Sequence, residues 1–203
     1  MNEHPLLSTA GMIKAILDDR KTQTRRVPVG RYLKWKVGDT IWVREAWWDL
    51  GSVVKGKWDG RLAAHTVKPR YVATCPDPYI EGIGGVVQPV RCNWKESALY
   101  HATWRKRPSI HMPRWVARIF LEITGLGDER VQDISEKDAL AEGVIVGSSA
   151  MGHTFTAKEH FKGLWDSINA NRGYGWRKNP VVKVIEFKRI KDGTNRTRSD
   201  IEN

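Results

Sequence analysis

The residues best suited to chemistry lie in one short run, Arg20 to Arg26, which holds one lysine, two threonines and three arginines. A lysine crowded by other cations should have a lowered pKa, which makes Lys21 a candidate base. Thr24 is a weak nucleophile by itself, but a neutral lysine amine can activate it through a hydrogen bond. The run therefore predicts proton transfer and attack on a carbonyl group. The alternative is a basic helix end that only complements the helix dipole.

Basic residues are concentrated in the first part of the chain, which has 203 residues and a formal charge of +11. The charge is +4 over residues 1–46 and +7 over residues 47–118, and it falls to −2 over residues 119–180. Seven of the ten tryptophans lie between Trp42 and Trp115. Positive charge interleaved with aromatic faces favours a nucleic-acid partner. A solvated basic surface over buried tryptophans is the alternative. Three adjacent residues are candidates for contacts to the nucleic-acid backbone: Arg105, Lys106 and Arg107.

Several classes of protein are disfavoured by the composition. No apolar run approaches the roughly 20 residues of a membrane span, and the first residues lack the basic start and apolar stretch of a secretory signal. Cys75 and Cys92 are too few for a disulfide framework and lack the CxxC spacing of a zinc site. The six histidines are scattered along the chain. We therefore expect a cytoplasmic protein that uses no metal, no cofactor and no membrane.

Apolar spacing and turn residues predict a mixed α+β fold. A helix is expected from Ser8 to about Asp19, and further helices are expected over 136–142, behind a Ser135 cap, and over 156–168. Strands are expected over 40–44, 117–123 and 180–187.

The middle of the chain, residues 47–110, is rich in Gly, Pro and charged residues, and it is predicted to be an insertion. It contains only short strand candidates, at 71–74 and 98–103. The polar tail from residue 191 is expected to be disordered. The prediction is one small barrel-like domain over residues 1–190 with a long central insertion.

Three blocks of the sequence resemble the signature of ASCH domains, which belong to the PUA-like β-barrel superfamily. The blocks span about 14–46, 118–143 and 180–190. They contain Ile-Leu-x-x-Arg-Lys-Thr-x-Thr from Ile16, Val-Gly-Asp from Val37, Ile-Ser-Glu-Lys-Asp from Ile134 and Val-Ile-Glu-Phe-Lys from Val184. The resemblance is strongest to the small bacterial N4-acetylcytidine amidohydrolases. It implies a PUA-like β-barrel with short flanking helices.

The resemblance also implies roles for individual residues. The positions that match catalytic residues of the family are Lys21, Thr24 and Glu142. Arg26 matches a motif arginine, and we expect it to bind the substrate together with Arg20. Arg25 departs from the family pattern, and we expect it to contact a nucleic-acid backbone.

Further candidates for substrate binding flank the insertion: Glu45, His111, Arg114 and Trp115. For Glu45 the alternative is a surface ion pair, and for His111 it is a hydrogen-bonded structural histidine. This chain is longer than the small amidohydrolases and has Trp-Val-Arg-Glu, from Trp42, after the Gly-Asp turn. In these two features it resembles proteins of bacteriophages and prophages.

Three functions from different classes stay open. The first is an amidohydrolase acting on an N4-acylated or otherwise modified cytosine, with Lys21 as base and Glu142 orienting it or carrying the proton to the leaving nitrogen. The second is a non-catalytic reader of a base in RNA or DNA. The third is a metal-independent ribonuclease. Retention of the whole catalytic set favours the first over the second, whereas the basic insertion favours a polymeric partner over a free nucleoside.

Overall fold

A computed structural model gives the fold of the chain and describes residues 2–54, 57–59, 70–71, 73–74, 102–147 and 154–191. The chain divides into two compact units. The first consists of Met1–Leu6, Gly11–Val43 and Arg118–Asn203, and the second of Leu7–Ala10 and Arg44–Ala117. The expected insertion falls within the second unit, and the tail beyond residue 191 lies outside the described residues. A single domain over residues 1–190 stays a prediction.

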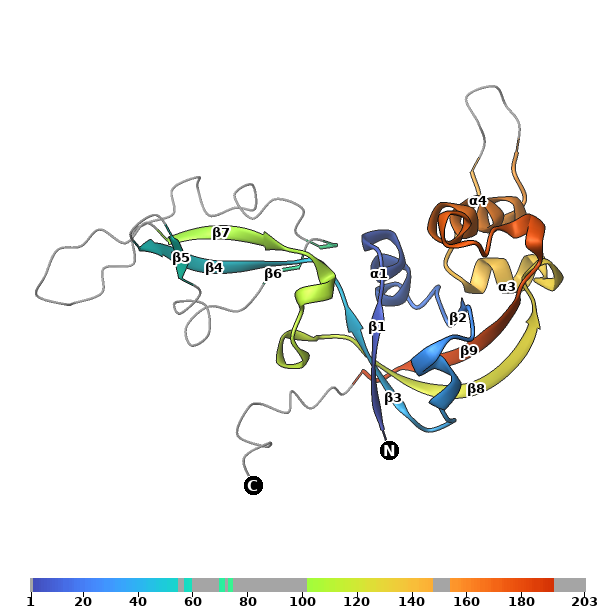
Figure 1. The fold of residues 1–203 in the computed structure, drawn as a ribbon, viewed down its shortest axis with the longest axis horizontal. Helices are drawn as coiled ribbons and strands as arrows, with labels where there is room; N and C mark the ends of the chain where they lie inside the picture. The colour runs from blue at the N-terminus through green and yellow to red at the C-terminus, as the bar shows by residue number, and fades with distance from the viewer. Residues whose placement is uncertain are drawn as a thin grey trace, which may run out of the picture. The chain divides into compact units, whose positions relative to one another are not determined.

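A five-stranded sheet organises the first unit (Figure 1). Its strands are β1 (Glu3–Leu7), β2 (Gln23–Arg26), β3 (Thr40–Arg44), β8 (Phe120–Arg130) and β9 (Val181–Arg189), in the spatial order β1-β3-β8-β9-β2. The long strands β8 and β9 pair antiparallel, with a register shift between Ile123 and Gly125. Strand β2 pairs antiparallel with β9, which places Arg25 opposite Val184. The N-terminal and C-terminal blocks of the sequence are therefore neighbours in the sheet.

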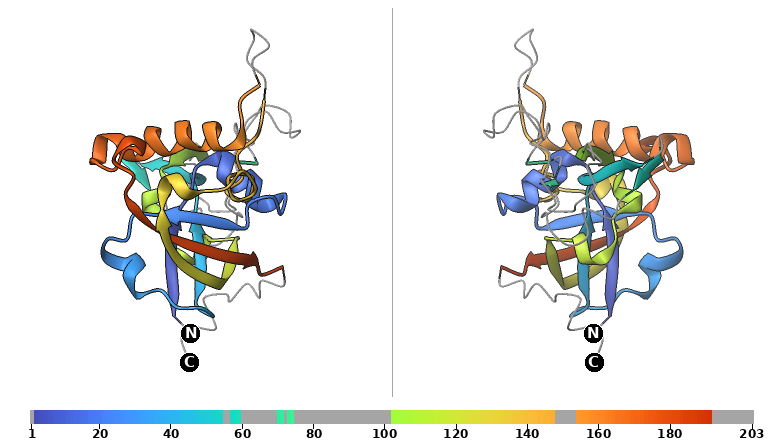
Figure 2. Two further views of the ribbon diagram at one scale, coloured as in Figure 1. Left: turned by 90° about the vertical axis from the view of Figure 1, so that its right-hand side faces the viewer. Right: turned by 90° about the vertical axis from the view of Figure 1, so that its left-hand side faces the viewer.

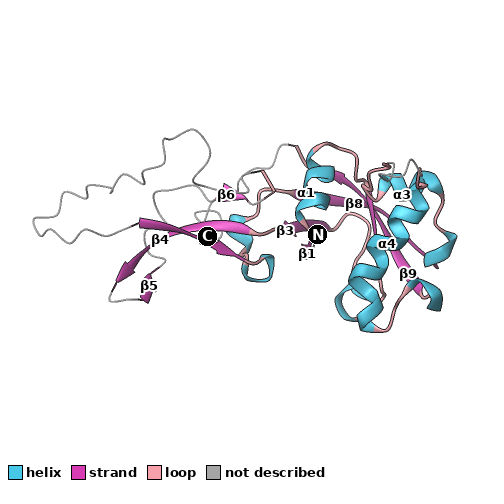
Figure 3. Ribbon diagram, turned by 90° about the horizontal axis from the view of Figure 1, so that it is seen from above, coloured by secondary structure: helices cyan, strands magenta, loops and turns pink. Residues whose placement is uncertain are grey.

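Three α-helices accompany these strands in the described part of the chain: α1 (Ala10–Leu17), α3 (Glu136–Ala141) and α4 (Ala157–Asn169). The Ser135 side chain caps α3 by accepting a hydrogen bond from the backbone N–H of Asp138, and Thr156 forms a capping box with Glu159 at the start of α4. Helices α3 and α4 pack together (Figure 3), and α4 is the straight helix at the top of both views of Figure 2.

The core between these helices and the sheet is apolar. It joins residues of α3, α4, β9 and the connecting segments: Val131, Ile134, Ala139, Val144, Ala157, Phe161, Trp165 and Val182.

Short 3-10 helices complete the described connections of both units: Gly30–Lys34, Ser109–His111, Arg114–Val116, Val131–Asp133, Ala170–Arg172 and Trp176–Lys178. The fold is thus a mixed α+β fold, as the sequence predicted.

The second unit contains a four-stranded sheet, made of β4 (Trp47–Val54), β5 (Lys57–Asp59), β6 (Arg70–Tyr71) and β7 (Ala102–Arg107). Strand β4 pairs antiparallel with each of the other three. Trp47 is buried and its neighbour Trp48 is half-buried, as expected for adjacent residues of a strand. In the described residues no helix has the length and apolarity needed to cross a membrane.

Most of the predicted elements are confirmed, and four predictions need correction. The strand predicted from 117 begins at Phe120 and continues to Arg130. The candidate at 71–74 is β6 followed by a turn, and the candidate at 98–103 becomes β7, while residues 98–101 lie outside the described residues. The basic run after α1 continues as strand β2 rather than as a helix end, because its backbone pairs with β9.

Candidate functional site

The side chain of Lys21 lies inside the first unit, where the chain leaves α1 and enters β2. It is only 2% exposed. Its Nζ donates hydrogen bonds to the backbone oxygen of Gln23 at 2.9 Å, to the backbone oxygen of Glu142 at 2.8 Å and to Oε2 of Glu142 at 2.6 Å. An ammonium group has three N–H donors, and each of them therefore has an acceptor.

Glu142 reaches Lys21 because α3 ends at this point. Its backbone N–H donates to the oxygen of Asp138 at 2.8 Å, and the next residue, Gly143, has a φ of +86°. A Cβ atom at Gly143 would lie 2.7 Å from Cβ of Ala15 and 3.0 Å from Cβ of Lys21. Glycine is thus required both by the left-handed turn and by the close approach of this turn to α1 and Lys21.

Burial is the main influence on the charge of Lys21. Desolvation lowers the pKa of the amine, the charge and hydrogen bond of Glu142 oppose that shift, and the nearby charges of Arg26 and Arg25 lower the pKa further. The net direction is downward from 10.5. The sequence predicted this direction but attributed it to the cationic neighbours, whereas loss of hydration makes the larger contribution.

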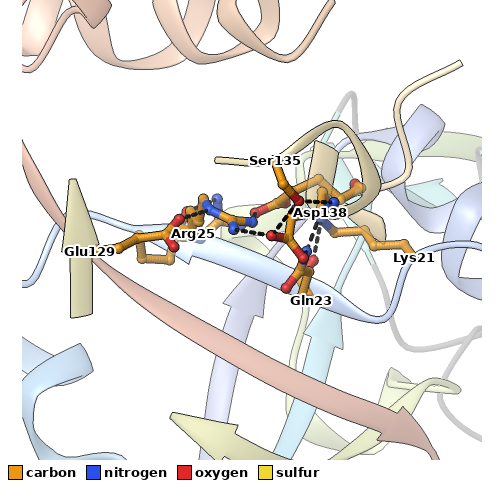
Figure 4. Close-up of polar contacts among 8 residues, drawn as sticks. Lys21, Gln23, Arg25, Glu129, Ser135 and Asp138 are labelled. Carbon is orange, nitrogen blue, oxygen red and sulfur yellow. Dashed lines mark hydrogen bonds and ion pairs between the residues drawn. The ribbon is translucent and has the colours of Figure 1, made fainter. Parts of the chain in front are cut away.

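Arg25 is a buried side chain at the centre of a network of ion pairs (Figure 4). Its side chain is 1% exposed, and Nε donates to Oε1 of Glu129 at 2.5 Å while Nη1 donates to Oε1 of Glu142 at 3.3 Å. Nη2 lies 3.8 Å from Oδ2 of Asp138. The expectation that Arg25 contacts a nucleic-acid backbone is therefore wrong for this structure, because the guanidinium is buried and bound to carboxylates of its own chain.

Asp138 connects this network to α3. Ser135 donates to Oδ2 of Asp138 at 2.7 Å, and Nε2 of Gln23 donates to its Oδ1 at 3.1 Å. The hydrogen bond from Ser135 is the largest influence that lowers the pKa of Asp138, and it outweighs the opposing effect of burial. Sequence reasoning missed Gln23, Glu129 and Asp138 as members of the site. The signal for Gln23 was its alternation with Lys21 and Arg25, which places all three on one side of an extended chain.

Thr24 is also buried, at 1% exposure, in the middle of β2. Strand alternation directs its side chain to the face opposite Gln23 and Arg25. No hydrogen bond joins its hydroxyl to Lys21 or Glu142, all three residues being among those the structure describes. The structure therefore brings together two of the three expected catalytic residues and does not bond the third to them.

The two arginines expected to bind substrate lie at the edges of this cluster. Arg20 is exposed and forms an ion pair with Asp18 at 3.1 Å. Arg26 is half-buried, and its Nη1 lies 3.5 Å from the backbone oxygen of Arg25. In the described part of the chain, no group of three or more His, Cys, Asp or Glu is placed to hold a metal ion.

The remaining candidates belong to the second unit. Glu45 is 1% exposed, so the alternative of a surface ion pair is wrong. His111 and Trp115 are exposed, and Arg114 is half-buried. Lys106 is exposed, with Nζ 5.9 Å from the centre of the Trp48 ring, and Arg107 pairs with Asp49 at 3.3 Å. The side chain of Arg105 lies outside the described residues.

Comparison with solved structures finds a similarity to the crystal structure of an ASCH domain from Lactobacillus crispatus JV V101. The two chains are 14% identical, the TM-score is 0.41, and the match covers 93% of this chain and 79% of the other. The likeness is weak and is one of fold alone. No protein-family model and no curated protein matches the chain.

Proposed function

We propose that the protein is an enlarged ASCH domain that hydrolyses an amide on a modified cytosine, of the N4-acylcytosine kind. The observation that carries this proposal is the buried contact of 2.6 Å between Nζ of Lys21 and Oε2 of Glu142. Desolvation lowers the pKa of Lys21, and a lysine that loses its proton more readily is suited to act as a general base. The resemblance of the sequence blocks around these two residues supports the choice of this substrate class.

The proposed amide hydrolysis uses Lys21, Glu142 and one water molecule. Neutral Lys21 takes a proton from a water molecule, whose oxygen attacks the acyl carbon and forms a tetrahedral intermediate. The bond between that carbon and N4 then breaks, and the proton passes from Lys21 to N4, which leaves a free cytosine amine and a carboxylic acid. Glu142 holds the amine in place throughout and stabilises its charged form. We assign the nucleophile to water rather than to Thr24, because no hydrogen bond links the Thr24 hydroxyl to Lys21.

Charge supports a nucleic acid as the carrier of the modified base. The formal charge of +7 over residues 47–118 would attract a polyanion. It would not attract a free nucleoside, which is neutral. The exposed Lys106 beside Trp48 and the exposed Trp115 are the kinds of side chain that bind phosphates and stack on bases.

The test is hydrolysis by the wild-type protein of N4-acetylated cytidine, offered as free nucleoside, in RNA and, as the deoxynucleotide, in DNA. Released acetate and the deacetylated cytidine are measured by chromatography. Strand cleavage is followed in the same reactions to detect a ribonuclease. Lys21→Met should abolish acetate release. Release of acetate from none of the three substrates, or at the same rate in Lys21→Met, would refute the proposal.

A non-catalytic reader of a modified base is the second candidate, and one observation favours it. All three N–H donors of Lys21 already have acceptors within the protein, and the side chain is 2% exposed. A purely structural ion pair would have the same arrangement. For a reader, the protein would bind the modified oligonucleotide more tightly than the unmodified one, would release no acetate, and would keep its affinity when Lys21 is replaced.

A further inference from the structure

We propose that Arg25 is a positioning residue of the Lys21–Glu142 pair, which holds Oε1 of Glu142 and leaves Oε2 to Lys21. This inference rests on the proposed function, since it concerns the same site. Arg25 does not itself touch the substrate in this proposal. It acts through Glu142.

The geometry divides the carboxylate of Glu142 between two cations. Oε1 accepts from Nη1 of Arg25 at 3.3 Å, and Oε2 accepts from Nζ of Lys21 at 2.6 Å. A guanidinium is planar and presents its N–H groups in a fixed fork, so a second carboxylate can orient it. Glu129 does so from the end of β8, through Nε at 2.5 Å. Arg25 can therefore rotate little, and Glu142 is held between two fixed donors.

The surroundings hold the guanidinium from other sides as well. The Phe161 ring of α4 has its centre 6.0 Å from Cζ of Arg25, and Asp138 of α3 lies 3.8 Å from Nη2. Elements β8, α3 and α4 thus converge on one side chain that β2 supplies. A lysine at this position has a single nitrogen and could not contact Glu129 and Glu142 with the same fixed geometry.

The division of the carboxylate has a consequence for proton transfer. When Lys21 loses its proton, Glu142 still faces one cation, because arginine stays charged at every accessible pH. Without Arg25 the same step would leave a buried carboxylate with no cation on either oxygen, which is strongly unfavourable. Arg25 thus makes the neutral form of Lys21 easier to reach. The other charged groups near the pair are Arg26, Glu129 and Asp138. The first disfavours the ammonium form of Lys21, and the last two face Arg25 and are 28% and 40% exposed, so water screens them.

The experiment follows the titration of Lys21 directly, by NMR of protein with ¹³C-labelled lysine side chains. Its signal is identified as the one missing from Lys21→Met. In Arg25→Met the midpoint of this titration should rise by about one pH unit or more, as expected when a nearby cation is removed from a buried site. Arg25→Lys, which keeps the charge, should show a smaller rise. Arg130→Met makes the same chemical change at an exposed position and should leave the midpoint where it is.

The outcomes separate this inference from the proposed function. An unchanged midpoint in folded Arg25→Met overturns the inference, whether or not the wild type hydrolyses an amide. A raised midpoint together with no hydrolysis by wild type supports the role of Arg25 and refutes the proposed function. If Arg25→Met does not fold, Arg25→Gln carries the same expectation, because its amide can still donate to a buried carboxylate. If Arg25→Met, Arg25→Lys and Arg25→Gln all fail to fold, Arg25 is a purely structural residue and the inference is overturned.

Discussion

Nζ of Lys21 lies 2.6 Å from Oε2 of Glu142, although the two residues are 121 positions apart in the chain. The turn at Gly143 makes this approach possible from one side, and the exit of the chain from α1 makes it possible from the other. The contact is buried, so each charge depends on the other and on Arg25 beside them.

The rate of hydrolysis should rise with pH. Burial lowers the pKa of Lys21 below 10.5, so the neutral amine that acts as base becomes populated as the pH rises through that lowered value. The measurement is kcat/KM for N4-acetylcytidine between pH 5 and pH 10. A rate that falls over this range, or that is independent of pH, would argue against Lys21 as the base.

Substitutions in the site should separate the roles of its members. Lys21→Met and Glu142→Gln should each reduce kcat/KM by about 10² or more, since each removes a group involved in proton transfer. Thr24→Ala should reduce it by less than about tenfold if a water molecule is the nucleophile. A loss in Thr24→Ala as large as in Lys21→Met would instead identify the hydroxyl as the attacking group. Circular dichroism of each variant provides the control for folding.

Gly143→Ala should both destabilise the protein and disturb the site. The substitution meets a φ of +86° and a contact of 2.7 Å with Ala15, so we expect the free energy of unfolding to fall by about 1–3 kcal/mol. The turn must shift to relieve the contact, which moves Glu142 away from Lys21 and reduces kcat/KM. Gly11→Ala is the matched control, because a Cβ there meets nothing within 4 Å in α1. It should leave stability unchanged or raise it by up to about 1 kcal/mol. Equal effects of the two substitutions in urea unfolding would contradict this account.

Asp39 should stabilise the fold in a pH-dependent way. Burial raises the pKa of its carboxyl, but hydrogen bonds from the backbone of Asn2, from His4 and from the backbone of Lys36 outweigh this effect and bring the pKa below 3.8. Its contribution is therefore complete above pH 3.8 and is lost as the pH falls through the lowered pKa of the folded state. Asp39→Ala should reduce the free energy of unfolding at pH 7 by about 1–3 kcal/mol.

The difference between wild type and Asp39→Ala should shrink as the pH is lowered toward 2, when urea unfolding is measured across that range. Asp128→Ala removes a carboxylate that is 55% exposed and bonded to Lys183, and it should have little effect at either pH. A difference for Asp39→Ala that stays constant with pH would show that the charge of the carboxylate is not what stabilises the fold.

Binding to an oligonucleotide should weaken steeply as salt is added, because bound lysines and arginines displace condensed counterions. Lys106→Ala should reduce the slope of log Kd against log salt by about one, and neutralising Arg105, Lys106 and Arg107 together should reduce it further. Lys162→Ala removes an exposed lysine from α4 and is the control. The measurement is fluorescence anisotropy between 50 and 300 mM KCl. A wild-type Kd that does not change with salt concentration would contradict a polyanionic partner.

The sequence by itself determined the elements whose formation depends on neighbouring residues. Helices α1 and α4 followed from the spacing of their apolar residues, and α3 followed from the capping side chain of Ser135. Strand β9 followed from a run of β-branched residues. The basic run pointed to Lys21, and the resemblance of the acidic helix pointed to Glu142. Periodicity and capping are local properties, so a single sequence contains them.

Only the tertiary structure decided what these residues touch. The sequence of β2 lacks the apolar alternation that predicts a strand. It forms a strand because β9, about 160 residues later, supplies its hydrogen-bond partners. Arg25 has the character of a surface residue in the sequence, yet it is buried because Glu129 and Glu142 arrive from other elements to neutralise it. Glu45 is also buried, and the residues next to it in the sequence do not predict this burial. Burial of a charge depends on partners that are distant in the chain, and a pattern of local residues carries no information about their distance in space.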